Sequence, residues 1–134
     1  MKKHDKSTRN LFHKIHLGQI KNVSGYNKIR YSLNEQTLKV KKNYFKNKIC
    51  ADLGCGSTGA GGFNLLNLGA KYCYLMDMDK HIKKKIHINL KKFKNKFKVD
   101  VGTLEKLPYK KNFFDFILCQ GVIHHMDKDL KGFK

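Results

Sequence analysis

The chain has 134 residues, of which 40% are hydrophobic, so it has room for one soluble domain with a modest core. Lysine and arginine number 29 against 10 acids, and the net charge of +19 would suit nucleic acid or an anionic membrane. The lysines, however, are spread through every segment, and Arg9 and Arg30 are the only arginines. We therefore interpret the charge as a solvated surface and disfavour specific nucleic-acid binding.

The cysteines and the apolar runs bear on two further classes of protein, metal-binding proteins and secreted or membrane proteins. The four cysteines show no metal-ligand spacing such as C-x-x-C, so we expect reduced, structural thiols and no metal site. The basic N-terminus lacks the apolar stretch of a signal peptide, and no apolar run is long enough to span a bilayer. These features predict a cytoplasmic protein without a membrane span.

The first predicted element precedes the main domain. Apolar or semi-apolar residues recur at steps of three and four from Tyr26 to Tyr44, with lysines opposite them. This spacing predicts an amphipathic helix that packs on the sheet that follows. We assign residues 1–48 to a basic N-terminal helical extension and residues 49–134 to the domain itself.

The sequence I-C-A-D-L-G-C-G-S-T-G-A-G-G, from Ile49 to Gly62, predicts a strand, a glycine loop and the start of a helix. Glycines at such a junction allow positive φ and let a ligand approach main-chain N–H groups. The spacing G-x-G-x-x-G between Gly54 and Gly59 also fits the dinucleotide fingerprint of an NAD(P)-dependent oxidoreductase. Asp52 favours a different ligand, because a carboxylate before the first glycine repels a pyrophosphate and attracts a cation.

The following residues alternate between strand and helix patterns. Four short apolar runs are predicted as strands: Ile49–Leu53, Tyr72–Met76, Phe97–Val101 and Phe113–Cys119. Two helices are predicted between them: Phe63–Leu68, which Gly69 ends, and Lys80–Lys92, which Asp79 caps. Asp77 follows the second strand, where an acid can accept both hydroxyl groups of a ribose. The pattern predicts an α/β fold with a Rossmann-like, doubly wound parallel sheet.

Two parts of the sequence carry a family resemblance. A-D-L-G-C-G, from Ala51 to Gly56, resembles the first motif of class I S-adenosylmethionine-dependent methyltransferases, whose cofactor carries a sulfonium and an ammonium. The third glycine of that motif usually stands where this chain has Thr58, so the loop holds one extra residue. G-T-L-E-K-L-P-Y and N-F-F-D-F-I-L-C-Q-G-V-I-H-H-M, beginning at Gly102 and Asn112, resemble the ubiquinone/menaquinone-biosynthesis-type (methyltransferase type 11) group.

The resemblance also implies an incomplete fold. Methyltransferases of this class have seven strands, and this chain supplies about four, in the expected spatial order third, second, first, fourth. We therefore expect either a fragment of a longer protein or a natural truncation. The fourth strand would then offer an unpaired edge for self-association.

The resemblance implies a set of residues around S-adenosylmethionine. Asp77 would accept the ribose hydroxyls, and a carbonyl at Cys119 or Gln120 would accept the ammonium. Thr103 replaces the acid expected at the adenine, so we expect main-chain recognition around Leu104, with the Thr103 hydroxyl or Glu105 as alternatives. The full expected set is Asp52, Gly54, Cys55, Gly56, Gly59, Asp77, Met78, Thr103, Leu104, Cys119 and Gln120.

The implied reaction is methyl transfer from S-adenosylmethionine to a small-molecule acceptor. Such a transfer draws mainly on proximity and alignment, because the sulfonium is already a good leaving group. His125 is the candidate general base, with packing at the start of a helix as an equal alternative. Two other functions stay open, a nicotinamide-dependent oxidoreductase and a non-enzymatic, basic RNA-associated module.

Overall fold

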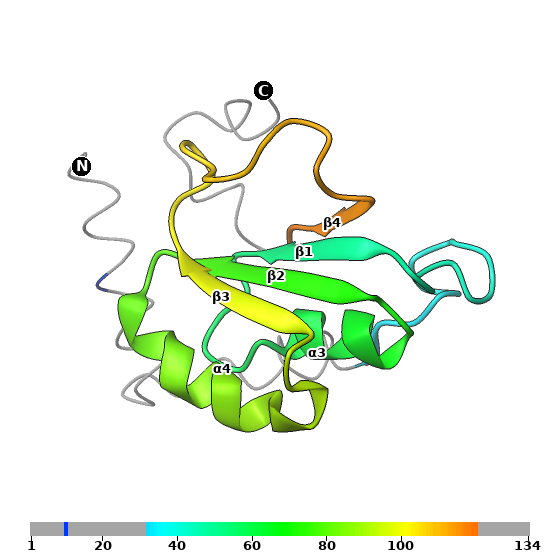
Figure 1. The fold of residues 1–134 in the computed structure, drawn as a ribbon, viewed down its shortest axis with the longest axis horizontal. Helices are drawn as coiled ribbons and strands as arrows, with labels where there is room; N and C mark the ends of the chain where they lie inside the picture. The colour runs from blue at the N-terminus through cyan, green and yellow to red at the C-terminus, as the bar shows by residue number, and fades with distance from the viewer. Residues whose placement is uncertain (1–9, 11–31, 121–134) are drawn as a thin grey trace.

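The computed structural model describes Asn10 and residues 32–120. Four parallel strands form one sheet in the order β3-β2-β1-β4 (Figure 1). Their bounds are β1 Ile49–Leu53, β2 Tyr72–Asp77, β3 Phe97–Val101 and β4 Phe116–Leu118. The chain runs outward from β1 to β3 and then returns to the other side of β1, which is the switch point of an open α/β sheet. This order confirms the predicted Rossmann-like fold.

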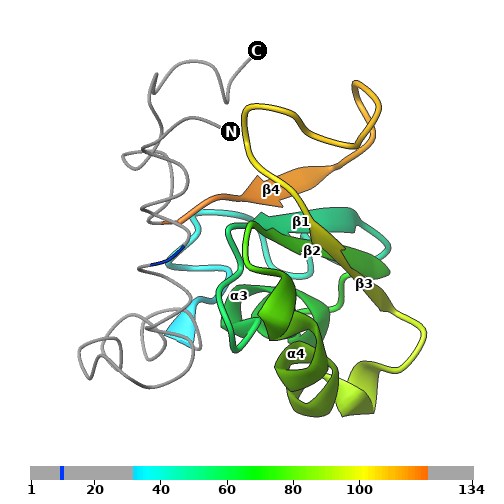
Figure 2. The same ribbon diagram turned by 90° about the vertical axis from the view of Figure 1, so that its left-hand side faces the viewer.

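The helices lie on one face of the sheet. α3 (Ala60–Asn67) joins β1 to β2, and η1 (Lys80–Ile82), α4 (Lys83–Asn89) and η2 (Lys91–Phe93) join β2 to β3. Figures 1 and 2 show α3 and α4 against the same face. Both crossovers move in the same direction along the sheet, and a right-handed crossover then places both helices on the same face. The return from β3 to β4, through residues 102–115, crosses the second face.

The face under the helices holds the larger core. Phe45 is fully buried in it and meets Phe116 edge to face, with ring centroids 4.9 Å apart. The chain just before β1 is therefore part of the same core. The other buried members are Cys50, Cys55, Leu65, Leu66, Ala70, Cys73, Leu75, Ile82, Ile86, Leu90, Val99 and Leu118.

The second face holds a smaller apolar cluster. Its buried members are Ala51, Leu53, Met76 and Leu104. Beside them the ring of Tyr74 on β2 lies 5.3–5.7 Å from three rings of the 102–115 crossover, those of Tyr109, Phe113 and Phe114. The crossover thus covers this part of the sheet with aromatic side chains.

The predicted helix from Tyr26 to Tyr44 is wrong where the structure describes it, because residues 33–48 form turns. Thr37 N–H donates to Asn34 Oδ1 and Asn34 N–H donates to Thr37 Oγ1, both at 2.9 Å, which closes one short turn. Lys39 and Asn43 then adopt positive φ, which ends any helical run. Residues 26–31 lie outside the described part.

Four element boundaries differ from the prediction, the smallest difference being that β2 includes Asp77. The helix predicted over Phe63–Leu68 begins earlier, at Ala60. The helix predicted over Lys80–Lys92 is divided into η1, α4 and η2, although its apolar face is buried as expected. β4 is shorter than predicted, because Asp115 anchors its start: the Asp115 carboxylate accepts Ile49 N–H and Asp115 N–H donates to Ile49 O, both at 2.8 Å. Phe113 and Phe114 instead pack on Tyr74.

The helix C-terminus predicted at Gly69 is confirmed. Gly69 has a φ of 106°, and its N–H donates to Leu66 O while Ala70 N–H donates to Leu65 O. This is the left-handed glycine ending that satisfies the last carbonyls of a helix. Within the described residues, no helix has the length and apolarity required to cross a membrane.

Candidate functional site

The carboxyl ends of the four strands meet at one edge of the sheet. Leu53 lies opposite Met76, Asp77 opposite Val101, and Asp52 opposite Leu118. The glycine loop, the residues after β2, the 102–109 turn and the residues after β4 all leave the sheet from this carboxyl edge (Figure 1). The structure therefore brings the predicted cofactor residues to one place. His125 lies outside the described residues.

The glycine loop is fastened to the end of β2. The N–H groups of Gly54 and Cys55 both donate to Met76 O, at 2.7 and 3.0 Å. Gly54, Gly56 and Gly59 have φ values of 77°, 68° and 63°, a region that L side chains rarely adopt. The loop's turn is thus fixed by main-chain contacts within the protein.

Gly59 faces the core. A Cβ at this position would lie 3.0 Å from Leu75 Cδ2 and 3.1 Å from Ile86 Cγ2. Its role is close packing of the loop against β2 and α4. Thr58, which stands at the family's usual glycine position, is not among the residues with positive φ, and its carbonyl accepts the Asn89 side-chain amide at 3.0 Å. The residue with the left-handed backbone conformation is therefore Gly59, one position after the family's usual glycine.

Asp52 caps the first turn of α3. It is fully buried, and its Oδ2 accepts the N–H of Gly62, the third residue of the helix, at 2.8 Å. A carboxylate at this end of a helix satisfies a main-chain donor and complements the helix dipole. It also occupies an N–H that a pyrophosphate would otherwise approach. The arrangement therefore disfavours the dinucleotide alternative.

Asp77 is held from two sides. Its Oδ2 accepts Gly56 N–H at 3.0 Å, and its Oδ1 accepts Asp79 N–H at 3.1 Å. Each carboxylate oxygen can accept a further hydrogen bond, so both remain suitable for ribose hydroxyls. Asp79 in turn caps η1 through the N–H of His81, at 2.9 Å, which confirms its predicted capping role. Met78, half-buried, lies between the two acids.

The residues after β3 form the predicted turn. Gly102 N–H donates to Asp77 O at 3.0 Å, and Lys106 N–H donates to Thr103 O at 3.2 Å, which ties the turn to β2 and closes it. Leu104 is buried in the cluster of the second face. Glu105 Oε1 is also buried and has no hydrogen-bond partner among residues 32–120. A buried carboxylate oxygen is costly without a donor, so Glu105 is suited to an amino group of a ligand.

The sequence did not single out Asp100 and Tyr109, which hold the crossover in place. Tyr109 O–H donates to Asp100 Oδ2 at 2.8 Å, and Lys98 Nζ lies 3.2 Å from Asp100 Oδ1. Burial, together with this hydrogen bond, raises the pKa of Tyr109 well above its usual range. The alternation in Phe97–Val101 places Asp100 on the second face, and the resemblance already placed Tyr109 in the adjoining turn. Those two facts together could have predicted the pair.

Cys119 and Gln120 follow β4. Leu118 lies opposite Asp52, so these residues continue beside the start of the glycine loop. Cys119 is half-buried and packs against the cluster of the second face. Their position fits the predicted contact between a main-chain carbonyl and an ammonium group.

The cysteines match a structural role. All four are free thiols, and three of them are buried. Burial raises the pKa of Cys50 to about 12 and that of Cys73 well above its ordinary value, so both stay protonated near neutral pH. Within the part of the chain that the structure describes, no group of three or more His, Cys, Asp or Glu is placed to hold a metal ion.

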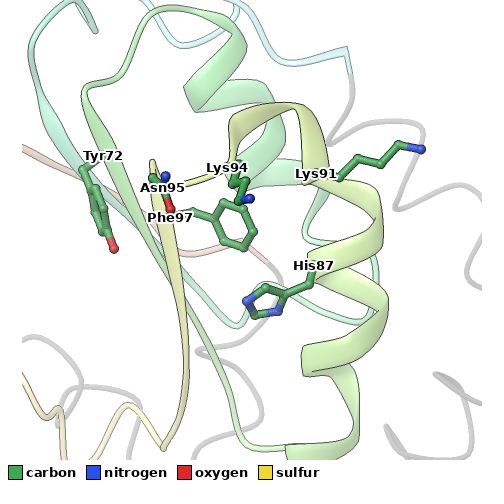
Figure 3. A pocket seen from close by; sticks show the side chains of 6 residues that line it. All are labelled: Tyr72, His87, Lys91, Lys94, Asn95 and Phe97. Atoms are coloured by element: carbon green, nitrogen blue, oxygen red, sulfur yellow. The ribbon is translucent and has the colours of Figure 1, made fainter.

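A separate hollow lies at the opposite end of the strands (Figure 3). Tyr72 and Phe97, the first residues of β2 and β3, belong to it. The remaining lining residues come from α4 and the chain after it: His87, Lys91, Lys94 and Asn95. This hollow is distinct from the carboxyl edge.

Three of the solved structures that share this fold are described as methyltransferases. A proposed RNA methyltransferase from Pyrococcus horikoshii is 26% identical with a TM-score of 0.58, over 74% of this chain and 45% of its own. A proposed S-adenosylmethionine-dependent methyltransferase from Methanococcus maripaludis is 18% identical with a TM-score of 0.68. The match covers 99% of this chain and 57% of that protein. A proposed sarcosine dimethylglycine methyltransferase from Galdieria sulphuraria is 21% identical with a TM-score of 0.62. The match covers 81% of this chain and 40% of that protein.

The sequence family described as a methyltransferase domain matches residues 51–134, more than half of the chain. This protein belongs to that family, which confirms the predicted resemblance. The chain spans between 40% and 57% of the length of the three solved structures. None of the curated proteins matches the sequence significantly.

Proposed function

We propose that the carboxyl edge binds S-adenosylmethionine and that the protein takes part in transferring its methyl group to an acceptor. The observation that carries this proposal is the pair of carboxylates at the glycine loop, Asp52 bonded to Gly62 and Asp77 bonded to Gly56. Two further acids, Asp79 near the end of β2 and Glu105 in the 102–109 turn, add to the negative charge of this edge. Such a site suits a cationic ligand better than a pyrophosphate.

Each part of the edge has a role in the proposal. The glycines Gly54 and Gly56 let the ligand approach the main chain, and Asp77 orients the ribose. Leu104 offers its main chain to the adenine, and the buried Oε1 of Glu105 supports the adenine amino group as a second contact. Cys119 and Gln120 lie beside the loop, where a carbonyl can accept the ammonium. The remaining expected residues, Cys55, Gly59, Met78 and Thr103, shape this edge.

The bound cofactor would supply a methyl group on sulfonium, and the chain's own residues would position the ligand and exclude water. The acceptor class proposed is a small molecule, with His125 as its general base. RNA is a second candidate acceptor, favoured by the 26% identity to the structure described as a proposed RNA methyltransferase. In this proposal residues 49–134 form the cofactor-binding domain, residues 1–48 a basic extension, and the protein is cytoplasmic.

Self-association through β4 is also proposed. Among residues 32–120 β4 is an edge strand, and its residue Ile117 is 50% exposed. An apolar edge with unpaired main-chain groups can pair with a second copy. Light scattering of wild type and Ile117→Lys should show association in the wild type alone. A monomeric wild type at high micromolar concentration would contradict this part of the proposal.

The site itself can be mapped by nuclear magnetic resonance. Titration with S-adenosylmethionine should shift the amide signals of the glycine loop, of Asp77 and Met78, and of Thr103 and Leu104. The amides of the hollow, such as those of Lys94 and Asn95, should not move. Shifts confined to the hollow, or saturating binding without shifts at the glycine loop, would overturn the proposed site.

A further inference from the structure

Although lysines occur in every segment, they are most concentrated in one part of the described structure. Between Lys80 and Lys98 the chain carries nine lysines, two histidines and no acid. All nine lysines are exposed. The acids nearest in sequence, Asp79 and Asp100, are each engaged with a neighbouring group, His81 and Lys98 respectively. The segment formed by α4, η2 and the start of β3 is therefore a continuous cationic region.

The hollow described above lies within this region, and we call it the lysine groove. It is defined by Tyr72, His87, Lys91, Lys94, Asn95 and Phe97. Figure 3 shows the Phe97 ring between Lys94 and His87, with Tyr72 on the other side of β3 and Lys91 directed away from the ring. The groove thus combines cationic groups, an amide and the ring of Phe97, because the Tyr72 ring lies on the other face of the sheet against Tyr74, with ring centroids 4.9 Å apart.

The aromatic ring of the groove is partly accessible. Phe97 is half-buried, and the rings of Phe97 and His87 lie 5.1 Å apart at 52°. His87 Nδ1 lies 2.8 Å from Lys83 O, an acceptor, so this nitrogen carries the proton. Nε2 of His87 then remains for a ligand. A planar base could stack here while its phosphates meet the lysines.

These features favour one kind of polyanion. Lysines alone would suit any phosphate-rich partner, but the partly accessible ring of Phe97 can stack only on a base that is unstacked, as in a single-stranded nucleic acid. A membrane-binding helix would need an apolar face, whereas Ile88 is the one large hydrophobic residue exposed on α4. We propose that the lysine groove binds a single-stranded nucleic acid, for which single-stranded RNA is the probe used below.

The groove and the carboxyl edge can be occupied independently. Tyr72 and Asp77 are the two ends of β2, so the sites lie about 16 Å apart along the strand. The inference therefore goes beyond the proposed methyl transfer and does not rest on it. RNA bound at the groove would be a docked partner, whatever molecule accepts the methyl group.

Fluorescence anisotropy with a labelled oligouridine of about twelve nucleotides tests the proposal. The double variant Lys91→Gln/Lys94→Gln should bind at least several-fold more weakly. The slope of log affinity against log salt concentration should also be smaller by about 1.4, because each lost contact with a phosphate reduces that slope by about 0.7. The control Lys41→Gln/Lys42→Gln makes the same charge change at exposed positions before β1 and should bind like the wild type. Equal losses in both double variants would overturn a localised groove.

A second variant tests stacking without a charge change. Phe97→Leu keeps an apolar side chain and should weaken RNA binding roughly five- to hundredfold. Circular dichroism and S-adenosylmethionine titration should show that the RNA-binding variants stay folded and keep the carboxyl edge intact. Lost RNA binding with retained cofactor binding would support the groove and leave the proposed function untouched.

Three competing ligands complete the test. Duplex RNA and vesicles of phosphatidylserine and phosphatidylcholine should each bind more weakly than the oligouridine. Equal affinity for duplex RNA would overturn stacking, and a single-stranded DNA oligomer of the same length that binds far more weakly would narrow the ligand to RNA. Vesicle binding that depends on Lys91 and Lys94 and exceeds RNA binding would identify the groove as a membrane surface instead.

Discussion

Asp52 Oδ2 accepts the main-chain N–H of Gly62 at 2.8 Å, so a buried carboxylate of β1 caps α3. The same contact places Gly61 directly above the acid, where a Cβ would lie 2.6 Å from Asp52 Oδ2. Glycine is required there because no larger residue fits between the helix and the carboxylate. The acid of the first motif thus has a structural role in addition to its charge.

Asp52→Asn separates these two roles. The amide oxygen can still accept the Gly62 N–H, while the negative charge at the helix end is lost. We expect a stability loss of about 1 kcal/mol from the helix-dipole contribution. Affinity for S-adenosylmethionine should fall several-fold, while NAD affinity should stay unchanged or improve.

Denaturant unfolding and calorimetric titration of the variant measure both effects. If Asp52→Asn binds S-adenosylmethionine as tightly as the wild type, the carboxylate acts only as a helix cap. Asp115→Asn is the control, because it neutralises an exposed carboxylate at the opposite end of the sheet while keeping an acceptor for Ile49.

The position of the left-handed turn can be tested with a pair of variants. Gly59→Ala puts a Cβ at a φ of 63° and within 3.3 Å of three side chains, so it should cost about 2–4 kcal/mol from backbone strain and overpacking. Thr58→Gly should cost only about 0.5–1 kcal/mol, through the flexibility of the unfolded chain. It should leave cofactor affinity within a few-fold. A large gain in affinity for Thr58→Gly would show that the loop alignment is wrong.

Thiol labelling probes the carboxyl edge without a mutation. Burial raises the pKa of Cys50 to about 12 and keeps its thiol from the solvent, so Cys50 should label slowly in the native protein at pH 8. Half-buried Cys119 should react first in the native protein, and S-adenosylhomocysteine should slow it. Mass spectrometry of labelled peptides measures both rates, and a Cys119 rate unaffected by ligand would place the cofactor elsewhere.

The sheet was predictable because short-range patterns govern it. The apolar runs gave all four strands, and the glycines and acids at their ends marked the carboxyl edge. The position of Asp77 at the carboxyl end of β2 and the capping role of Asp79 could be predicted, because acids at the end of a buried strand are typical both of ligand sites and of helix starts. The role of Asp52 as a cap for α3 was not predictable, since it depends on how closely Gly61 and Gly62 approach β1.

The segment before β1 shows where periodicity misleads. Leu33, Val40 and Tyr44 fit a helical stripe and do pack against the core, but from turns. Reciprocal bonds between Asn34 and Thr37 outweigh the helical pattern, because short polar side chains compete with the helix for main-chain groups. The length of β4 was overestimated for a related reason. Phe113 and Phe114 have strand propensity, but their rings pack against Tyr74 outside the strand.

The central claim is that the carboxyl edge binds S-adenosylmethionine through Asp77. Calorimetric titration of wild type, Asp77→Ala and Asp115→Asn with S-adenosylmethionine and with NAD tests it most directly. The wild type should bind S-adenosylmethionine and not NAD. Asp77→Ala should lose about 1.5–3 kcal/mol, roughly ten- to more than a hundredfold in affinity, and Asp115→Asn, which keeps the acceptor for Ile49, should bind normally. Wild-type binding of NAD without binding of S-adenosylmethionine would contradict the account.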